Sequence, residues 1–442
     1  MILANADPVE FRLRTNRKKG IVLMSGEQRE VHSAEELSAA VADKKVGQIT
    51  IAADLSELPM LRISPGQILR AAGERTALFF ASGQDGVQLS TNNQLENLYL
   101  HTDQDRRALF NDTSMDHLGR FVLRNLSING VVQLLARDKV RGGHVEVEEL
   151  HIEHADARNY EDRPKGYGVE VIPGAFTLWN QQDDPTVTIT ADITGLSAGH
   201  DGAPVFGSGI FISGAGESGG RLIARRLETG AVYSNGGIAP GSPDRISGGI
   251  FVVFGAFVDS VRNCRQVTTY GANDMVLDNW GAVDRWTAEE KITSHGASGI
   301  GFVNFGTVNA LVVNAPIETF GQGARGFNVY AGTVHAADFE RIVTHGNGAV
   351  GIQISQPVGQ IKIRRGIETF GGTGDSLVKG VVLKLSAIAL SIKPGGAARE
   401  VDIAGGLITH GRGVTPIEVH GAIGRLHVAD GLTATGEGFD TI

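Results

Sequence analysis

The residues Val267-Thr268-Thr269-Tyr270-Gly271 are followed one repeat later by Ile292-Thr293-Ser294-His295-Gly296, and the pattern recurs three more times at the same spacing. The further copies are Ile317-Glu318-Thr319-Phe320-Gly321, Ile342-Val343-Thr344-His345-Gly346 and Ile367-Glu368-Thr369-Phe370-Gly371. A unit of about 25 residues that is rich in Val, Ile, Thr and Gly is too short for a pair of helices and favours strands. The spacing therefore predicts an all-β fold, a parallel β-helix solenoid with coils of about 25 residues.

The first apolar residue of each copy is predicted to form a core column. It lies two positions before the Thr or Ser, so both side chains face the same side of a strand. Stacked coils would pair every strand with those above and below it at about 4.8 Å. We therefore expect Ile292, Ile317, Ile342 and Ile367 to stack in one buried column.

Glycine spacing also places the insertions. A second glycine divides each coil into two parts. The part from this second glycine to the next motif glycine hardly varies in length, whereas the part from the motif glycine to the second glycine is short in some coils and much longer in others. The extra length lies at 231–247 and 372–386, with a third insertion near 155–167. Insertions at one corner of a solenoid project from one face. We expect them to border a trough over the bare coils, roughly 24 Å long at one strand spacing per coil, which suits an oligosaccharide.

The N-terminal region is predicted to cover the open end of the solenoid. Ser33-Ala34-Glu35-Glu36 is a capping box that predicts a helix to about Ala42, followed by a strand from Gln48 to Ile51. Such a helix would shield the first coil and its unpaired strand edge. We accordingly divide the chain into residues 1–66, the cap and first strands, and residues 67–442, the parallel β-helix.

Three N-terminal segments carry a resemblance to a known superfamily. Ala34 to Val41 before a strand, then Gln67 to Gly73 and Gly83 to Val87, are similar to the entrance of the pectate-lyase-like right-handed β-helix superfamily. The resemblance covers nearly the whole chain and implies a right-handed parallel β-helix. That superfamily includes polysaccharide lyases, glycoside hydrolases, epimerases, esterases, fructan-cyclising transferases and phage tailspikes, and it often forms homotrimers.

Composition narrows the partners. The net charge of −9 gives no electrostatic reason to expect nucleic acid or an anionic membrane. No stretch reaches the roughly 18 apolar residues of a membrane span, and Met1 to Phe11 has no export signal. A single cysteine, Cys264, excludes disulfides within the chain and thiolate metal sites. We expect a cytoplasmic protein without metal or cofactor.

The predicted floor of the trough, Gly271 to Gly281, is dense in polar and aromatic residues. Sugar chemistry needs one carboxylic acid of raised pKa, one ionised carboxylate and a flat apolar surface. Asp274, Asp278 and, from the neighbouring insertion, Asp244 are the catalytic candidates. The turn-forming habit of Asp and Asn beside Gly is the alternative explanation. The substrate-binding candidates on this floor are Asn273, Asn279 and Trp280.

A second set of candidates follows the repeat. Tyr270 and His295 belong to a column of rings just before the motif glycine, which is either a ridge for sugar rings or a packed stack; His295 is also a candidate acid or base. Asn279, Asn304 and Asn328 occupy near-equivalent places, where an internal amide ladder is the alternative to ligand binding. Arg325 and Lys379 are candidate contacts for a carboxylated or hydroxylated sugar.

These features favour a carbohydrate-active enzyme that cleaves or rearranges a glycosidic bond of an oligo- or polysaccharide, as a glycoside hydrolase or an intramolecular glycosyl or fructosyl transferase. Two alternatives stay open. One is a non-catalytic carbohydrate-binding or structural β-helix, such as a tailspike-like or surface component. The other is a polysaccharide lyase, which ranks lower because the floor lacks the Lys and Arg cluster that would neutralise a uronate.

Overall fold

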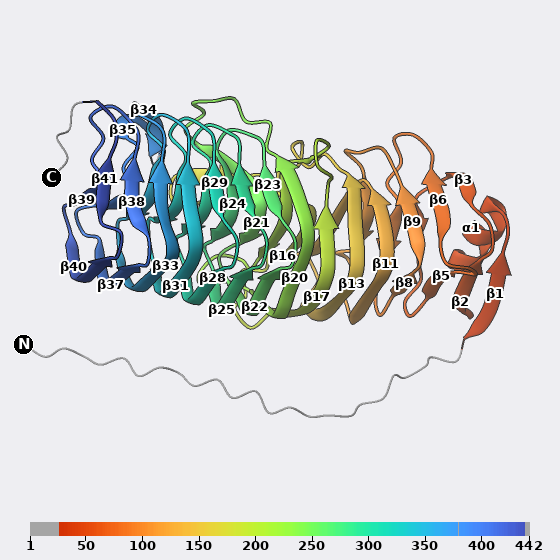
Figure 1. Cartoon of the computed structure of the whole chain (residues 1–442). Coiled ribbons are helices and arrows are strands. Elements are labelled where there is room, and N and C mark those ends of the chain that lie inside the picture. Colours follow the sequence, from red (N-terminus) through yellow and green to blue (C-terminus); the bar gives the residue numbers. More distant parts are fainter. Residues whose placement is uncertain (1–25, 379, 438–442) are drawn as a thin grey trace, which may run out of the picture.

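The computed structural model describes residues 26–378 and 380–437. This part of the chain is nearly all β, with one α-helix and long parallel sheets, as expected of an all-β parallel solenoid (Figure 1). Its strands form a 24-stranded sheet, a 15-stranded sheet and a two-stranded hairpin. In Figure 1 the strands lie side by side along one elongated body, from the N-terminal end to the C-terminal end.

The 24-stranded sheet, here called the first sheet, faces the viewer in Figure 1. Its strands are β1 (Glu27–Val31), β2 (Val46–Ile51), β3 (Leu55–Leu58), β5 (Ile68–Ala71), β6 (Thr76–Phe80), β8 (Gln94–Glu96), β9 (Leu98–His101), β11 (Arg120–Asn129), β13 (Gly142–His154), β17 (Thr188–Ala198), β18 (Val205–Phe206), β20 (Arg221–Asn235), β22 (Ala256–Asn263), β23 (Val267–Thr269), β25 (Ala282–Ala288), β26 (Ile292–Ser294), β28 (Thr307–Val313), β29 (Ile317–Thr319), β31 (Thr333–Thr344), β33 (Pro357–Thr369), β37 (Ala397–Ile403), β38 (Gly406–Thr409), β40 (Ala422–Val428) and β41 (Leu432–Ala434).

The 15-stranded sheet, here called the second sheet, contributes one strand per coil on its main path. Its strands are β4 (Leu61–Arg62), β7 (Val87–Leu89), β10 (Arg107–Asn111), β12 (Val131–Ala136), β16 (Gly174–Asn180), β19 (Ser208–Ser213), β21 (Arg245–Val252), β24 (Asp274–Asn279), β27 (Ile300–Asn304), β30 (Arg325–Val329), β32 (Val350–Ile354), β36 (Leu390–Ile392) and β39 (Ile417–Val419), with β14 (Lys165–Gly166) and β15 (Val169–Val171) beside them. The hairpin consists of β34 (Thr373–Val378) and β35 (Val381–Ser386).

The predicted isoleucine column is confirmed. Ile292 pairs with Ile317, Ile317 with Ile342 and Ile342 with Ile367, all in parallel register. Each is at most 1% exposed. Burial of a branched aliphatic side chain stabilises a fold by about 1.5–3 kcal/mol relative to exposure, so this column contributes strongly to the long narrow core.

The second sheet also carries a column that faces away from the core. The register joins Phe251 on β21 to Asp278 on β24, Asp278 to Val303 on β27, Val303 to Asn328 on β30, and Asn328 to Gln353 on β32. The neighbouring residues Leu277, Phe302 and Phe327 lie in the core. Asp278 and Asn328 therefore belong to the outer surface of the second sheet, beneath the insertions.

The helix α1 (Ala34–Ala42) forms where the capping box predicts it. The Ser33 hydroxyl accepts a hydrogen bond from Glu36 N, and His32 N donates to Glu36 Oε2 at 2.7 Å. Leu37, Ala40 and Val41 are buried. α1 lies at the N-terminal end of the body (Figure 1), and β2 pairs with β5 across the predicted division at residues 66 and 67.

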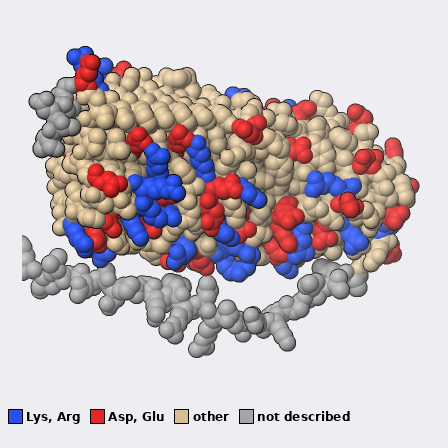
Figure 2. All heavy atoms as spheres, in the orientation of Figure 1, with Lys and Arg blue, Asp and Glu red and all other residues tan. Residues whose placement is uncertain are grey.

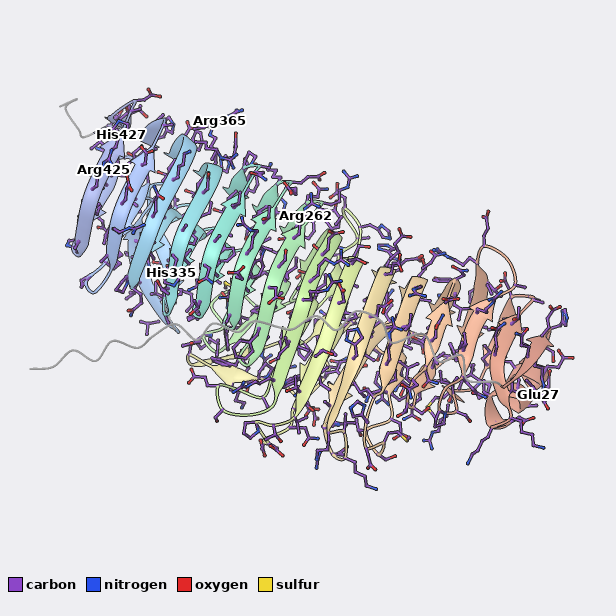
Figure 3. The ribbon with its side chains drawn as sticks, turned by 90° about the horizontal axis from the view of Figure 1, so that it is seen from below. Glu27, Arg262, His335, Arg365, Arg425 and His427 are labelled. Atoms are coloured by element: carbon purple, nitrogen blue, oxygen red, sulfur yellow. The ribbon has the colours of Figure 1, made fainter. Side chains whose placement is uncertain are left out.

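Charges of both signs are interspersed on the face formed by the first sheet (Figure 2). Arg262, Arg365 and Arg425, which Figure 3 labels, each lie within 3.2 Å of a glutamate of a neighbouring coil. Exposed pairs of this kind contribute at most about 1 kcal/mol each. Within the described residues, no helix has the length and apolar character needed to cross a bilayer.

Candidate functional site

The three predicted insertions converge on one cleft above the second sheet. Tyr167 comes from the insertion at 155–167, Pro243 from that at 231–247, and Leu377 from the hairpin in the insertion at 372–386. Met275 and Asp278 belong to the floor. The expectation that the insertions project from one face is therefore confirmed.

The cleft is narrower than the expected open trough. Its volume is about 60 Å³, room for roughly four water molecules. The hairpin leans back over the earlier coils, because Leu377 N donates to Ser298 Oγ at 3.2 Å and Arg325 Nη2 donates to Ser376 Oγ at 2.9 Å. A Cβ added at Gly380 would lie 3.4 Å from Pro243 O. The insertions at 231–247 and 372–386, which form the two walls of the predicted trough, thus meet above its floor. The sequence predicted a distance of roughly 24 Å between them.

A cluster of rings closes the other side of the cleft. Tyr167 stacks on Phe305 with ring centroids 4.4 Å apart, and its hydroxyl donates to Phe305 O at 3.3 Å. The Trp280 ring lies 5.2 Å from Tyr167, 5.6 Å from Phe305 and 5.0 Å from Phe254. Trp280 is 3% exposed, so it supports the wall and presents no free face to solvent.

Asp278 is the most unusual side chain of the site. It is 0% exposed, and neither carboxylate oxygen has a hydrogen-bond partner among the described residues. Burial raises its pKa well above the ordinary value. The Trp280 indole faces the carboxyl and offsets part of this rise, although no hydrogen bond of normal geometry joins them. Asp278 therefore favours the neutral acid, a hydrogen-bond donor at the floor of the cleft.

Asn328 shares this condition two coils further along the same column. It is 0% exposed, and neither its Oδ1 nor its Nδ2 has a hydrogen-bond partner among the described residues. The Trp280 Nε1 is likewise without a partner there. Buried polar groups without partners are rare in native proteins, and each one left so costs about 1–3 kcal/mol.

Unlike Asp278, Asp274 has hydrogen-bond partners for its carboxylate. It is 0% exposed, and its carboxylate accepts from Ser247 Oγ at 2.5 Å, Gly271 N at 2.7 Å and Gly236 N at 3.2 Å. Burial raises its pKa to about 6, and these hydrogen bonds lower it in part. Its oxygens hold the start of the second insertion against the coil, so they are occupied.

The other candidates near the second insertion differ in exposure. Asn273 is 2% exposed, and its Nδ2 donates to Ser242 O at 2.7 Å and Arg245 O at 3.3 Å, so it anchors the insertion as well as lining the cleft. Asp244 is exposed and does not line the cleft. Its main-chain oxygen accepts from Glu170 N at 2.8 Å.

The expectation that three asparagines occupy near-equivalent places is wrong for one of them. Asn279 pairs in register with Asn304, and Asn279 Nδ2 donates to Asn304 Oδ1 at 2.8 Å. Both are 0% exposed and form an internal amide ladder. Asn304 next pairs with Val329, whereas Asn328 pairs with Val303. Asn328 therefore belongs with Asp278 on the outer surface.

Arg325 is fully buried beneath the hairpin. Besides its bond to Ser376, its Nη1 donates to Gly323 O at 3.1 Å, and its guanidinium lies 6.0 Å from the Tyr330 ring centroid. Arg325 therefore fastens the hairpin, which forms the roof of the cleft, and it has no solvent-exposed surface for a sugar. Lys379, the other predicted sugar contact, lies outside the described residues.

The column of rings before the motif glycine is a continuous stack. Tyr270, His295, Phe320, His345, Phe370 and His410 lie with centroids 4.5–5.1 Å apart and ring planes within 12° of each other. Each inner ring uses both faces on its neighbours, so only ring edges remain for solvent. This excludes stacking of sugar rings on the inner members. Burial, helped by Lys291, lowers the pKa of His295.

Several lining residues had no signal in the repeat pattern. Tyr167 and Leu377 come from insertions whose course in space the period does not determine, and Ser298 joins through a contact distant in sequence. No group of three or more His, Cys, Asp or Glu side chains in residues 26–378 and 380–437 is arranged to hold a metal ion.

Comparison of the chain with models of known protein families, with curated proteins and with solved structures found no match.

Proposed function

We propose that the chain is a carbohydrate-active enzyme, with Asp278 as proton donor to a glycosidic oxygen of an oligo- or polysaccharide bound in the cleft. One observation carries the proposal. A buried carboxylic acid without a hydrogen-bond partner among the described residues lines the cleft on which three insertions converge. Groups of raised pKa in clefts are typical of functional sites. The rings beside it offer the apolar surface that sugar faces pack against.

In hydrolysis, Asp278 gives its proton to the glycosidic oxygen while the bond from that oxygen to the anomeric carbon breaks. A water molecule adds to the anomeric carbon and loses a proton to a second carboxylate. We assign that role to Asp244, which is exposed outside the closed cleft but follows the lining residue Pro243 and reaches the substrate only after the cleft opens, because the carboxylate of Asp274 is held by three hydrogen bonds. Intramolecular transfer uses the same acid, with a sugar hydroxyl in place of water.

A sugar ring reaches Asp278 only when the roof moves, since the cleft has a volume of about 60 Å³. The hairpin is suited to this movement. Its first strand is held to the earlier coils by hydrogen bonds with Ser298, Gln322, Gly323 and Arg325. On its second strand, by contrast, Val381, Val382 and Leu383 are 45–57% exposed. Opening of a hairpin or loop before chemistry is common in enzymes.

A non-catalytic carbohydrate-binding or structural solenoid is the second candidate. The specific observation in its favour is that Asp278 is the one carboxylate among the described residues that line the cleft. Binding needs only a donor and an apolar surface, whereas cleavage needs a second carboxylate. A polysaccharide lyase fits less well, because it needs a base to take a proton from carbon, whereas burial raises the pKa of Asp278 and so favours its acid form.

Turnover of defined oligosaccharides tests the proposal. Cello-, malto-, xylo-, chito- and galacturonate hexasaccharides are incubated with the protein, and products are measured by mass spectrometry. Asp278→Asn should lower turnover at least about a hundredfold, with an unchanged melting temperature or a higher one. Asp116→Asn, at an exposed aspartate with no side-chain partner among the described residues, is the matched control and should retain turnover.

The outcomes separate the two candidates. Loss of turnover in Asp278→Asn and in Asp244→Asn supports the enzyme with both assigned roles. Unchanged turnover in Asp278→Asn contradicts the proposed acid. Binding of a hexasaccharide without any product favours the non-catalytic solenoid.

We also propose that the solenoid winds in a right-handed sense, that its coils have about 25 residues, and that α1 caps the first coil. The homotrimer and the cytoplasmic location stay predictions. Light scattering in solution measures the first, and fractionation of the source cells the second.

A further inference from the structure

A second, larger hollow lies beside the cleft, here called the polar groove. Its volume is about 620 Å³, within the range of small-molecule sites. It is lined by the turns that follow β12, β16, β19 and β21, together with Asp162 and Lys165 of the insertion at 155–167. Four successive coils and one insertion therefore build it.

The groove offers groups of the kinds that sugars use. Trp179 is half-buried, and because its Nε1 donates to Gly214 O at 3.0 Å, its remaining surface is apolar ring. Asp183 is exposed and has no ion-pair partner among the described residues. The buried Nε of Arg137 has no hydrogen-bond partner there either. Sugar hydroxyls both donate and accept, and a sugar face packs on a ring.

One row of rings joins the polar groove to the cleft. Phe254 lines the groove, and Phe305 and Tyr330 line the cleft. Trp280 lies between them, with centroids 5.0 Å from Phe254 and 5.6 Å from Phe305. The span from the coil of β16 to that of β27 is four strand spacings, about 19 Å. Gly166 and Tyr167 cover this row, because a Cβ added at Gly166 would lie 2.5 Å from the Phe254 ring and the Tyr167 ring lies 5.2 Å from Trp280. An extended molecule that contacts both hollows therefore crosses over this insertion.

We propose that the polar groove is a saccharide-binding subsite that anchors the chain whose next units enter the cleft, and that it prefers neutral or amino sugars to uronates. The proposal rests on the proposed function for the choice of a saccharide. Three acids, Asp138, Asp162 and Asp183, face two bases, Arg137 and Lys165. Both bases are already paired, Arg137 with Asp162 at 2.8 Å and Lys165 with Glu170 at 2.6 Å. A polyanionic saccharide would therefore be repelled by the carboxylate of Asp183, which no base neutralises among the described residues.

Binding of the five hexasaccharides is measured by calorimetry on the full chain, apart from turnover. Trp179→Ala should weaken binding of the preferred neutral or amino hexasaccharide at least about tenfold, because it removes the ring surface. Asp183→Ala should weaken it about two- to tenfold, as expected for one hydrogen bond. Asp183→Ala changes an exposed, unpaired side chain, so it keeps the test valid if Trp179→Ala does not fold. Asp116→Ala is the control and should bind as the wild type does.

The results distinguish this proposal from the proposed function. Wild-type affinity in both groove variants, with turnover still lost in Asp278→Asn, overturns the subsite and leaves the catalytic site standing. Binding of the galacturonate hexasaccharide as tight as that of the others overturns the charge preference. If the wild type binds none of the five, both the subsite and the proposed function are overturned.

Discussion

Replacement of Asp278 should stabilise the fold in a pH-dependent manner. The unfolded side chain has an ordinary pKa near 3.8, and burial raises the folded pKa well above it. Above pH 3.8 the unfolded chain therefore gives up a proton that the folded chain keeps. The wild type then loses up to about 1.4 kcal/mol of stability per pH unit until the pH passes the folded pKa. Between pH 4 and pH 5.5 this amounts to about 2 kcal/mol.

Two substitutions separate the charge from the missing hydrogen bonds. Asp278→Asn keeps the polar group but does not ionise, so its advantage over the wild type should widen by about 2 kcal/mol between pH 4 and pH 5.5. Asp278→Leu also removes the unpartnered polar atoms, and the adjacent cleft of about 60 Å³ leaves room for the larger side chain. It should gain about 1–3 kcal/mol more than Asn at every pH.

Urea denaturation followed by circular dichroism at pH 4, 4.75 and 5.5 measures these differences. Asp274 also titrates in this range, but it is present in all three proteins. Its contribution therefore cancels when their free energies of unfolding are compared. If the difference in the free energy of unfolding between Asp278→Asn and the wild type does not change with pH, Asp278 has an ordinary pKa in the folded protein. Asp278→Leu less stable than Asp278→Asn at pH 4 would show that its oxygens have partners in solution.

Three further changes test the fold and the roof. Ile317→Asp should prevent folding, because an unpaired buried carboxylate costs several kcal/mol, whereas Ile317→Val should cost about 0.5–1.5 kcal/mol; folded yield and thermal melting decide. Ser376→Ala removes the hydroxyl that accepts from Arg325 Nη2, so hydrogen exchange across 373–386 should become faster, and unchanged exchange would contradict the fastening. Asn273→Ala removes two hydrogen bonds to the insertion at 231–247 and should speed proteolysis there, while cleavage at the wild-type rate would contradict its role as an anchor.

The sequence predicted those parts of the fold that the repeat itself specifies. A glycine at the same place in every repeat and an isoleucine four positions before it place one coil on the next, so the register of Ile292 to Ile367 follows from local pattern alone. The same period, applied strictly, pairs Asn328 with Val303 and so with Asp278. Treating Asn328 as equivalent to Asn304 was an error of one position, and one position reverses the face of a strand.

The course of the insertions could not be derived in this way. The roof depends on contacts such as Leu377 N to Ser298 Oγ, between residues 79 positions apart, which no period encodes. Burial also separated two aspartates that look alike in the sequence: Asp274 has three hydrogen bonds and Asp278 has none among the described residues. The ring stack of Tyr270 to His410 was expected as a column, but its parallel ring planes depend on packing of side chains between coils.

The proposed function depends on Asp278 being a neutral acid that faces a saccharide in the cleft. Carbon-13 NMR of protein labelled at aspartate carboxyl carbons tests it directly, with the resonance assigned by its loss in Asp278→Asn. We predict that this resonance stays at the position of the protonated acid at pH values where the bulk of the aspartate resonances have moved to the position of the carboxylate, and that it shifts when a hexasaccharide that the protein binds is added. A resonance that titrates together with the other aspartates, or that does not respond to a saccharide the protein binds, would show that Asp278 is not a neutral acid in a saccharide site.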